Sequence, residues 1–509
     1  MKSLLKRLWE DKTLFCLLVI AFLARIIAIF FAKGFGMHDD HFLVIEASQS
    51  WVDGFDYNYW LPWSKLNTGP DGHNFFYVGI HFILFIILKW IHIFNPQNKM
   101  IIIRLIHALW SLLIVKFGYK ITLKLSDKKA AIQVGLMLAL LWIFPWLSVR
   151  NLVEVVSIPF LMWGMWLLIK EENIKTSTLI WVGFLFGLAF TTRFQTLMFI
   201  SSIGLVFLIR RQWNHIIYVV FGFCLSIFIF EGIIDLIFWG KPFAETLEYL
   251  KYNMTHSKDY IISSWYTYLL FLLGVLIPPV SIALFIGFFR TWKKHLLFFL
   301  PTFLFLIFHS TFPNKQERFI LTIVPFFIIL GIVGRSEFIA HKPELYLKSK
   351  KLIKAALIFF WTINFILLFV FSFHYSKRSR VESMTYLSKY KNVQMIMMEN
   401  TNATDTKMPP LFYLGQWVGV LEISKTKNLD SLKLYLNKYK CPPRFILFEG
   451  DKYLNARVDS LKKILPNIES ETVVKPGLID DLVYKLNPIN VNQTIYIYRN
   501  KDYFPSKID

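Results

Sequence analysis

The run LFCLLVIAFLARIIAIFF at residues 14–31 is long and apolar enough to cross a bilayer as one α-helix. Similar runs recur as far as residue 373, separated by shorter polar stretches. The 509-residue chain is 55% hydrophobic and its mean hydropathy is +0.47, well above an ordinary soluble domain. Because backbone polar groups inside a bilayer must be bonded within the protein, these runs predict helices. We therefore expect a polytopic α-helical membrane protein with about 11–12 transmembrane helices.

The net charge of +22 comes largely from lysine and arginine clusters between the apolar runs, as at residues 124–129, 210–211 and 290–294. Such clusters are typical of the cytosolic ends of membrane helices. No basic face interleaved with aromatic residues occurs outside the membrane part, so nucleic-acid binding is not expected. No small-residue cleavage site follows the first run, which predicts a retained helix with a cytosolic N-terminus.

Two long polar interruptions, at residues 34–73 and 239–264, separate the apolar runs. Both are rich in tyrosine and tryptophan, which favour the headgroup level of a membrane, so we expect loops that carry interfacial helices. The charge pattern predicts that residues 34–73 form the first extracytoplasmic loop.

The composition changes after the last apolar run, where charged residues become frequent. Short apolar stretches typical of strands alternate there with helical periods. The expected strands are 394–398, 445–448, 482–486 and 494–498, and the expected helices are 429–439 and 458–465. The sequence thus predicts a membrane domain at 1–375 and an extracytoplasmic soluble α/β domain at 376–509.

The motif MHDDHF at residues 37–42 follows the first apolar run. Two adjacent carboxylates near a bilayer are costly to ionise without water, cations or a charged substrate. The residues alone leave three interpretations open. The pair can be a solvated helix end; one carboxylate can be a general base, with His38 and His41 bonded to the pair or to a donor phosphate; or His38, Asp39 and His41 can bind a metal.

A second motif, FPNKQERF at residues 312–319, lies between two apolar runs. Lys315 and Arg318 are three residues apart and form a positive spot at a membrane boundary, which suits a phosphate group. The spot lies on the side opposite to the other basic clusters, where ordinary anchoring does not explain it. This position favours an anionic partner.

The third motif is RNLVE at residues 150–154, in which Arg150 and Glu154 are spaced to pair on one helical face. Such a pair can be structural or can orient a substrate. Arg104, Arg193 and Asp235 are further charges in or beside apolar runs, where ionisable groups are costly and often functional.

MHDDHF, NLVE and NKQERFILTIVP together resemble motifs of the GT-C superfamily of membrane glycosyltransferases. The resemblance is closest to the family 22 mannosyltransferases of GPI-anchor and dolichol-linked oligosaccharide synthesis. That family has an acidic pair before His-Phe, an N-x-x-E step, and a late signature close to H-K-E-x-R-F. This chain has Asn314 for the histidine, Gln316 for an acid, and Asp40 where glutamate is usual.

The resemblance implies inverting transfer of a sugar, in particular mannose, from a polyprenyl-phosphate donor to an acceptor hydroxyl at the extracytoplasmic face. Asp39 would then take the acceptor proton with Asp40 as its partner, while Lys315 and Arg318 would stabilise the departing phosphate. No cofactor and no metal-ligand set is expected. The residues expected to bind or orient substrate are His38, His41, Asp71, His73, Asn151, Glu154, Arg193 and Glu317.

A transporter or flippase of lipid-linked sugars is the alternative, since it also needs many helices and intramembrane charge. It predicts an inverted repeat and matching broken helices, and the sequence has neither. A non-enzymatic scaffold would leave the acidic pair and NKQERF without a role.

The expected partners are the bilayer, a polyprenyl-phosphate-linked sugar and a glycan, glycolipid or other hydroxyl acceptor. Richness in Ile, Lys, Asn and Phe suits an AT-rich bacterial genome, which predicts the inner membrane with the site and C-terminal domain in the periplasm.

Overall fold

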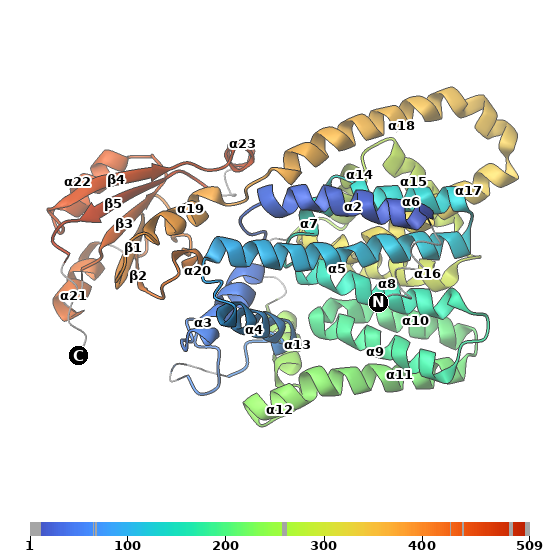
Figure 1. Cartoon of the computed structure of the whole chain (residues 1–509), viewed down its shortest axis with the longest axis horizontal. Helices are drawn as coiled ribbons and strands as arrows, with labels where there is room; N and C mark the ends of the chain where they lie inside the picture. Colours follow the sequence, from blue (N-terminus) through green and yellow to red (C-terminus); the bar gives the residue numbers. More distant parts are fainter. Residues whose placement is uncertain are drawn as a thin grey trace. The chain divides into compact units, whose positions relative to one another are not determined.

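The chain folds into two compact units, shown in Figure 1. One unit comprises Met1–Ala32, Tyr59–Ile80 and Ile101–Phe373, and we call it the helical unit. The other comprises Lys33–Asn58, His81–Met100 and His374–Asp509, and we call it the sheet unit. The sheet unit therefore contains two early segments in addition to the C-terminal residues. The computed structural model describes residues 12–64, 66, 69–256, 262–427, 429–439, 442–487 and 492–503.

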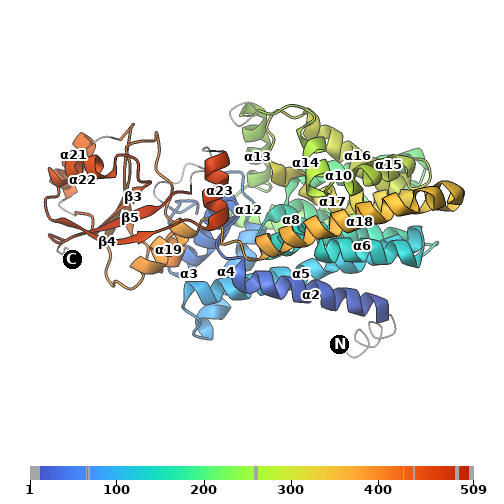
Figure 2. The same cartoon turned by 90° about the horizontal axis from the view of Figure 1, so that it is seen from above.

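The first 375 residues form helices wherever the long apolar runs occur. The expected retained N-terminal segment at 1–11 and residues 257–261 of the second long loop lie outside the described residues. The helices are α2 (Lys12–Phe31), α3 (Ala47–Val52), α4 (Phe75–Trp90), α5 (Pro96–Leu125), α6 (Lys128–Leu140), α7 (Ile143–Leu147), α8 (Val153–Lys170), α9 (Thr176–Thr192), α10 (Leu197–Ile209), α11 (Trp213–Ile227), α12 (Ile233–Trp239), α13 (Ala244–Thr255), α14 (Thr267–Val275), α15 (Val280–Arg290), α16 (Leu296–Thr311), α17 (Val324–His341) and α18 (Pro343–Ser372). Figure 2 shows α18 along the outside of the helical unit.

Six helical segments in the described ranges are long and apolar enough to cross a membrane. They are Lys12–Phe31, Pro96–Leu125, Val153–Lys170, Trp213–Trp239, Glu317–His341 and Tyr346–Ser372. Helices α14 and α15, bent by 119° at their junction, would count as a seventh span together. The expected total of about 11–12 crossings would also need the four shorter apolar helices of 10–17 residues. A mostly helical membrane fold is confirmed.

Small residues allow close packing within the helical unit. A Cβ added at Gly183 in α9 would lie 2.0 Å from the carbonyl oxygen of Val219 in α11. One added at Gly334 in α17 would lie 2.0 Å from the carbonyl oxygen of Gly287 in α15. Lipid provides no hydrophobic drive between helices, so such close backbone approach supplies the packing that holds them together.

A buried arginine joins three helices near the start of the chain. Arg25 in α2 is fully buried, and its Nε donates to Ser111 Oγ at 2.7 Å. Its terminal nitrogens donate to the carbonyl oxygens of Ala21, Ala139 and Leu138 at 3.0, 3.3 and 3.4 Å. Because every guanidinium nitrogen has an acceptor, this charge is tolerated and connects α2 to α5 and α6.

The sheet unit contains a five-stranded sheet in the order β2-β1-β3-β5-β4. Strand β1 pairs parallel with β2 and β3, whereas β5 pairs antiparallel with β3 and β4. Helices α21 and α22 pack on one face around Met397, Ile446, Phe448, Leu432 and Val458. The elements are α19 (Arg378–Leu387), β1 (Met395–Asn400), α20 (Leu411–Leu414), β2 (Gly419–Ser424), α21 (Leu429–Tyr439), β3 (Phe445–Glu449), α22 (Leu454–Lys462), β4 (Ile468–Val474), α23 (Leu478–Leu486) and β5 (Ile495–Asn500).

Three of the four expected strands are strands, but the one expected at 482–486 is wrong. These residues end the helix α23, because Leu478, Leu482 and Leu486 recur at a spacing of four residues, which is the period of a helix. The prediction also missed β2 and β4. Both lie at the edges of the sheet and are less buried than β1 and β3, so they lack the apolar runs of the central strands.

Candidate functional site

The acidic motif lies in the sheet unit, within a helical stretch at residues 38–52. Its central part, Asp40–Glu46, is π-helical, a conformation found often at functional sites. Asp39 is half-buried, whereas Asp40 is buried with 3% of its surface exposed. Of the two carboxylates, Asp39 is therefore the more accessible to a substrate.

The two histidines of the motif lie in different environments. His38 is exposed and its ring lies 4.4 Å from that of Phe42. His41 is fully buried and stacks between Phe35 and Tyr413, at ring distances of 4.4 and 5.4 Å. His41 can therefore position the motif from within the sheet unit, and His38 is the more accessible of the two histidines.

Glu46 completes a buried polar pair with His41. Glu46 Oε1 lies 3.2 Å from His41 Nε2 and accepts the backbone N–H of Phe412 at 3.0 Å. Both side chains are fully buried. Burial raises the pKa of Glu46 to about 8 and lowers the pKa of His41 well below its ordinary value. Both groups are consequently neutral at neutral pH.

The Glu46→Gln variant is expected to flatten the pH dependence of stability. Glu46 binds its proton more tightly in the folded chain, so its contribution is complete below its ordinary pKa of 4.5 and is lost as pH rises through about 8. The loss is on the order of 4 kcal/mol. Thermal unfolding followed between pH 5 and pH 9 measures it, with Glu469→Gln, an exposed glutamate of the same unit, as the control. An unchanged slope in the Glu46 variant contradicts the assignment.

Residues at the start of the C-terminal segment hold the acidic motif in place. The ammonium of Lys377 and the guanidinium of Arg380 lie 4.7 and 5.3 Å from the ring centre of Phe35. Gly34 pairs with Ser376 as an isolated bridge, and its φ of 76° favours glycine. A Cβ there would lie 1.9 Å from the carbonyl oxygen of Ser376. No local sequence pattern connects these segments, which are more than 300 residues apart along the chain.

A second charged group lies in the helical unit, and we call Glu154, Arg193 and Arg318 the arginine cluster. Glu154 is fully buried in the first turn of α8. Its Oε1 lies 3.0 Å from Arg193 Nη2, at the end of α9, and 3.6 Å from Arg318 Nε, in the 3₁₀-helix Glu317–Ile323. Glu154 therefore brings two arginines from separate elements to one buried carboxylate.

The expected pairing of Arg150 with Glu154 is wrong. Helix α8 begins at Val153, so Arg150 precedes the helix and the two residues share no helical face. The Arg150 guanidinium instead lies 5.2 Å from the ring of Trp146. The partners of Glu154 come from segments far away in the sequence.

Two glutamines and a phenylalanine complete the arginine cluster. Arg193 Nε donates to Gln195 Oε1 at 3.0 Å, and Arg318 Nε donates to Gln316 Oε1 at 2.8 Å. The two guanidinium groups lie 5.1 and 5.6 Å from the ring centre of Phe319. No sequence motif indicated these roles, although each glutamine lies two residues from the arginine that it binds. Gln316, which departs from the family signature, thus orients Arg318.

Lys315 makes contacts of a different kind. Its Nζ donates to the carbonyl oxygens of Ser263 and Phe312 at 3.0 and 2.6 Å. Desolvation lowers its pKa from the ordinary value. Lys315 therefore joins the end of the second long loop to the NKQERF segment, and its role toward a phosphate stays a prediction. Glu317 is exposed.

The remaining predicted site residues lie in the helical unit. The Tyr77 hydroxyl donates to the carbonyl oxygen of Asn151 at 3.2 Å and lies 2.6 Å from His107 Nε2. Burial raises the pKa of Asp71 from its ordinary value. The backbone N–H of His73 donates to Glu245 Oε2 at 3.0 Å.

Glu245 connects the two long loops within the helical unit. Its Oε2 also accepts the N–H of Gly72 at 2.7 Å, and its Oε1 accepts the indole N–H of Trp239 at 2.9 Å. Its own N–H donates to Asp235 Oδ2 at 3.0 Å. Burial raises the pKa of Glu245 to about 7. The intramembrane charge at Asp235 thus has a structural partner.

Replacing Glu245 by alanine is expected to lower the free energy of unfolding of the helical unit by about 2–4 kcal/mol. Three N–H donors, one of them buried and two partly buried, would lose their acceptor. Intrinsic tryptophan fluorescence during thermal unfolding measures the change. The control is Glu248→Ala in the same helix, whose carboxylate pairs with exposed Lys251 and should cost less than about 1 kcal/mol. Equal melting temperatures for the two variants would refute the connection.

The structure also bears on metal binding. Within the described ranges, no three His, Cys, Asp or Glu side chains are close enough together to hold a metal ion. His38, Asp39 and His41 accordingly do not form a group of metal ligands.

The fold resembles solved membrane glycosyltransferases. ArnT from Cupriavidus metallidurans, in a crystal structure with undecaprenyl phosphate, aligns with a TM-score of 0.62 at 12% identity, covering 97% of this chain and 98% of ArnT. The Archaeoglobus fulgidus oligosaccharyltransferase, crystallised with Zn and sulfate, aligns with a TM-score of 0.54 at 12% identity, covering 87% of this chain and 69% of that chain. The fold is therefore that of the GT-C class, which confirms the resemblance seen in the motifs.

The chain belongs to the Alg9-like mannosyltransferase family, whose model matches residues 16–408. A curated relative is GPI mannosyltransferase 3 of Saccharomyces cerevisiae, 28% identical over 218 residues, which cover 39% of this chain. The match spans about a third of that relative, 34% of its length. The relatives come from yeast, a bacterium and an archaeon, so they support a multi-pass membrane protein without singling out a bacterial inner membrane.

Proposed function

We propose that this protein is an inverting glycosyltransferase, in particular a mannosyltransferase, that uses a polyprenyl-phosphate-linked sugar and an acceptor hydroxyl. Membership of the Alg9-like family supports mannose as the sugar. The lipid donor is supported by two neighbours of the same fold. ArnT was solved with undecaprenyl phosphate, and the Archaeoglobus enzyme was solved with an inhibitory peptide and a dolichol-phosphate.

The arginine cluster is the observation that carries this proposal. A polyprenyl phosphate gains negative charge as the bond to its sugar breaks. Arg193 and Arg318 meet at one buried carboxylate, which places two guanidinium groups where they can donate to that phosphate. Arginine offers forked donors to phosphate oxygens, and preorganised donors act most strongly where water is scarce. Arg193 has 15% of its side chain exposed, which leaves an approach for an anion.

Asp39 is proposed as the base. In the reaction, the acceptor hydroxyl oxygen bonds to the anomeric carbon while its proton moves to the Asp39 carboxylate. The bond between the anomeric carbon and the phosphate oxygen breaks, and its electron pair stays on the phosphate. Attack opposite to the leaving group inverts the anomeric configuration. Asp40 is buried and follows Asp39 directly in the sequence, and it would hold the base in position.

We further propose that the reaction takes place at the extracytoplasmic face, which in a bacterium is the periplasmic face of the inner membrane. The basic clusters between the apolar runs support this orientation, since such clusters stay in the cytosol. The C-terminal domain at 376–509 is proposed to lie on the same side as the acidic motif and to help hold the acceptor.

The purified protein, reconstituted in lipid nanodiscs, should consume a mannosyl polyprenyl phosphate and release polyprenyl phosphate together with a mannosylated acceptor. A nucleotide-activated mannose serves as the control donor and should not react. Nanodiscs have no enclosed compartment, so this assay detects chemistry and not transport. Donor left intact in nanodiscs, together with sugar-lipid movement across sealed vesicles, would instead support the flippase alternative.

A further inference from the structure

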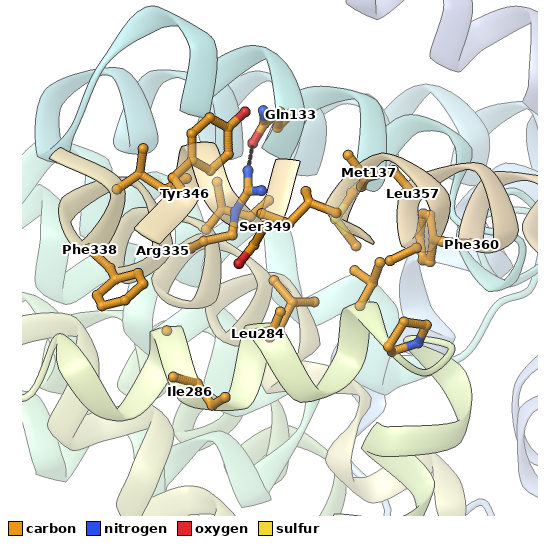
Figure 3. A pocket seen from close by; sticks show the side chains of 18 of the residues that line it. Gln133, Met137, Leu284, Ile286, Arg335, Phe338, Tyr346, Ser349, Leu357 and Phe360 are labelled. Atoms are coloured by element: carbon orange, nitrogen blue, oxygen red, sulfur yellow. Dashed lines mark hydrogen bonds between the residues drawn. The ribbon is translucent and has the colours of Figure 1, made fainter. Parts of the chain in front are cut away.

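The helical unit contains a large apolar groove that none of the sequence motifs predicts. Its volume is about 720 Å³, and it lies between α6, α15, α17 and the first two thirds of α18 (Figure 3). Aliphatic and aromatic side chains form most of its walls, among them Leu284, Ile286, Leu352, Leu357 and Phe360. A volume of this size suits a sizeable apolar ligand.

The polar side chains of the groove gather at one end of these helices. Arg290 is the last residue of α15, and Arg335 lies in the second half of α17. Tyr346 and Ser349 lie near the start of α18, and Gln133 lies in the first half of α6. Figure 3 shows Arg335 beside Tyr346 and Ser349, donating to Gln133. The groove is therefore polar at one mouth and apolar along its length.

Helix α18, which forms one wall of the groove, is little covered by other protein segments. Only 17% of its most apolar stretch is buried within the described structure, compared with 89% for the span that contains α17. On the opposite wall, a Cβ at Gly287 would lie 2.0 Å from the carbonyl oxygen of Gly331, so α15 and α17 are in close contact. The lining residues Ile286, Leu352 and Leu357 are exposed, so the groove opens toward the surrounding lipid.

Charge at the polar mouth is positive. The Arg290 guanidinium lies 4.5 Å from the ring centre of Phe338, and no carboxylate lines the groove within the described residues. The acids nearby are engaged elsewhere. Asp127 accepts the N–H of Ala130 at 2.9 Å and the hydroxyl of Ser336 at 2.7 Å, and Glu337 binds Lys294 and His295 at 2.7 and 3.0 Å.

We propose that this groove binds one anionic phospholipid of the surrounding bilayer. The phosphodiester lies at Arg290 and Arg335, and an acyl chain runs along the apolar walls toward Phe360. Basic pockets between membrane helices recognise anionic headgroups, and arginine forms forked hydrogen bonds to phosphate. A soluble phosphate would leave the apolar walls exposed to water, which favours a lipid.

The groove is separate from the arginine cluster of the proposed function. Arg318 precedes helix α17, whereas Arg335 lies about three turns after the start of that helix at Val324. The two positive sites therefore lie toward opposite ends of one membrane span. The bound lipid is a constituent of the membrane and takes no part in sugar transfer.

The test measures lipid retention by native mass spectrometry of the full-length protein in detergent. Delipidated protein is titrated with phosphatidylglycerol or with phosphatidylcholine, in the absence of any sugar donor. Wild type should bind one phosphatidylglycerol and bind phosphatidylcholine much more weakly. The double variant Arg290→Gln/Arg335→Gln should bind phosphatidylglycerol about 30-fold more weakly, because two charges near a phosphate are lost.

Two further variants make the result specific. Arg210→Gln/Arg211→Gln removes two charges from the end of α10, outside the groove, and should bind like wild type. Ala356→Trp fills the groove from α18 without a change of charge and should also abolish retention, which covers the case in which the arginine variant does not fold. Equal binding of both lipids, unchanged binding by the Arg290/Arg335 variant, or equal loss in the Arg210/Arg211 variant would overturn the proposal. Sugar transfer is not measured, so a failure here is distinct from failure of the proposed function.

Discussion

The Arg318→Gln variant is expected to transfer sugar about 10²–10³ times more slowly than wild type, the usual cost of removing one preorganised donor from a developing negative charge. The guanidinium is held by Gln316 and by Glu154, so its position does not depend on the substrate. Steady-state kinetics with a mannosyl polyprenyl phosphate measure the effect. The loss should fall mainly on kcat, because the phosphate charge increases only as the bond to the sugar breaks.

A purely structural role for Arg318 would produce a similar loss, because its removal changes the charge balance around buried Glu154. The double variant Glu154→Gln/Arg318→Gln separates the two explanations. It removes the buried anion together with the cation, so the thermal stability should return toward that of wild type. If the guanidinium acts on the phosphate, transfer stays low despite the recovered stability. Recovery of transfer in the double variant would show that Arg318 serves only to neutralise Glu154.

The same comparison applies to Arg193, which binds the same carboxylate from the end of α9. Its substitution by glutamine should also lower transfer, and lysine at this position should restore only part of it. Lysine keeps the charge but presents a single point of contact in place of a fork. Full activity with lysine would indicate that charge alone is sufficient at this position.

The Asp39→Asn variant is expected to lose transfer by a factor of about 10²–10⁴, the usual contribution of a general base. Asparagine has nearly the same size and cannot take the acceptor proton. Donor affinity should stay within about twofold of wild type, because Asp39 belongs to the acceptor side of the proposed reaction. Single-turnover transfer and a separate donor-binding measurement test both parts.

The pH profile distinguishes a base from a residue that only shapes the site. Wild-type kcat/KM should fall at low pH as Asp39 takes up a proton, and this limb should disappear in the residual activity of Asp39→Asn. Asp405→Asn, at an exposed acid of the same unit, is the matched control and should leave transfer unchanged. Transfer by Asp39→Asn at the wild-type rate would remove Asp39 as the base.

Local patterns in the sequence predicted the parts of this protein that depend on local physics. Apolar runs predicted helices, since a chain in lipid has no other way to bond its backbone. Helical periods and buried strands were found where their residues are apolar, as in β3. The edge strands β2 and β4 were missed because edge strands need few apolar residues, and α23 was mistaken for a strand because its run is short.

The motif matches predicted the GT-C class and the family, and they named Glu154 and Arg318 as site residues, whereas Arg193 was singled out as a charge beside an apolar run. They did not predict that these three residues contact one another. The expected partner of Glu154, Arg150, was chosen by helical spacing, and that choice was wrong because α8 begins three residues after it. A spacing rule applies only inside one helix, whereas the observed pairs join three separate elements.

By itself, the sequence therefore determined the membrane class, the family and the residue types at the acidic and arginine motifs. These properties follow from composition and from short ordered patterns. Only the tertiary structure decided that His41 lies buried between Phe35 and Tyr413, that two arginines share Glu154, and that α18 leaves an apolar groove with arginines at its mouth. The physical reason is that burial and charge pairing depend on which distant segments pack together, and no local pattern records that packing.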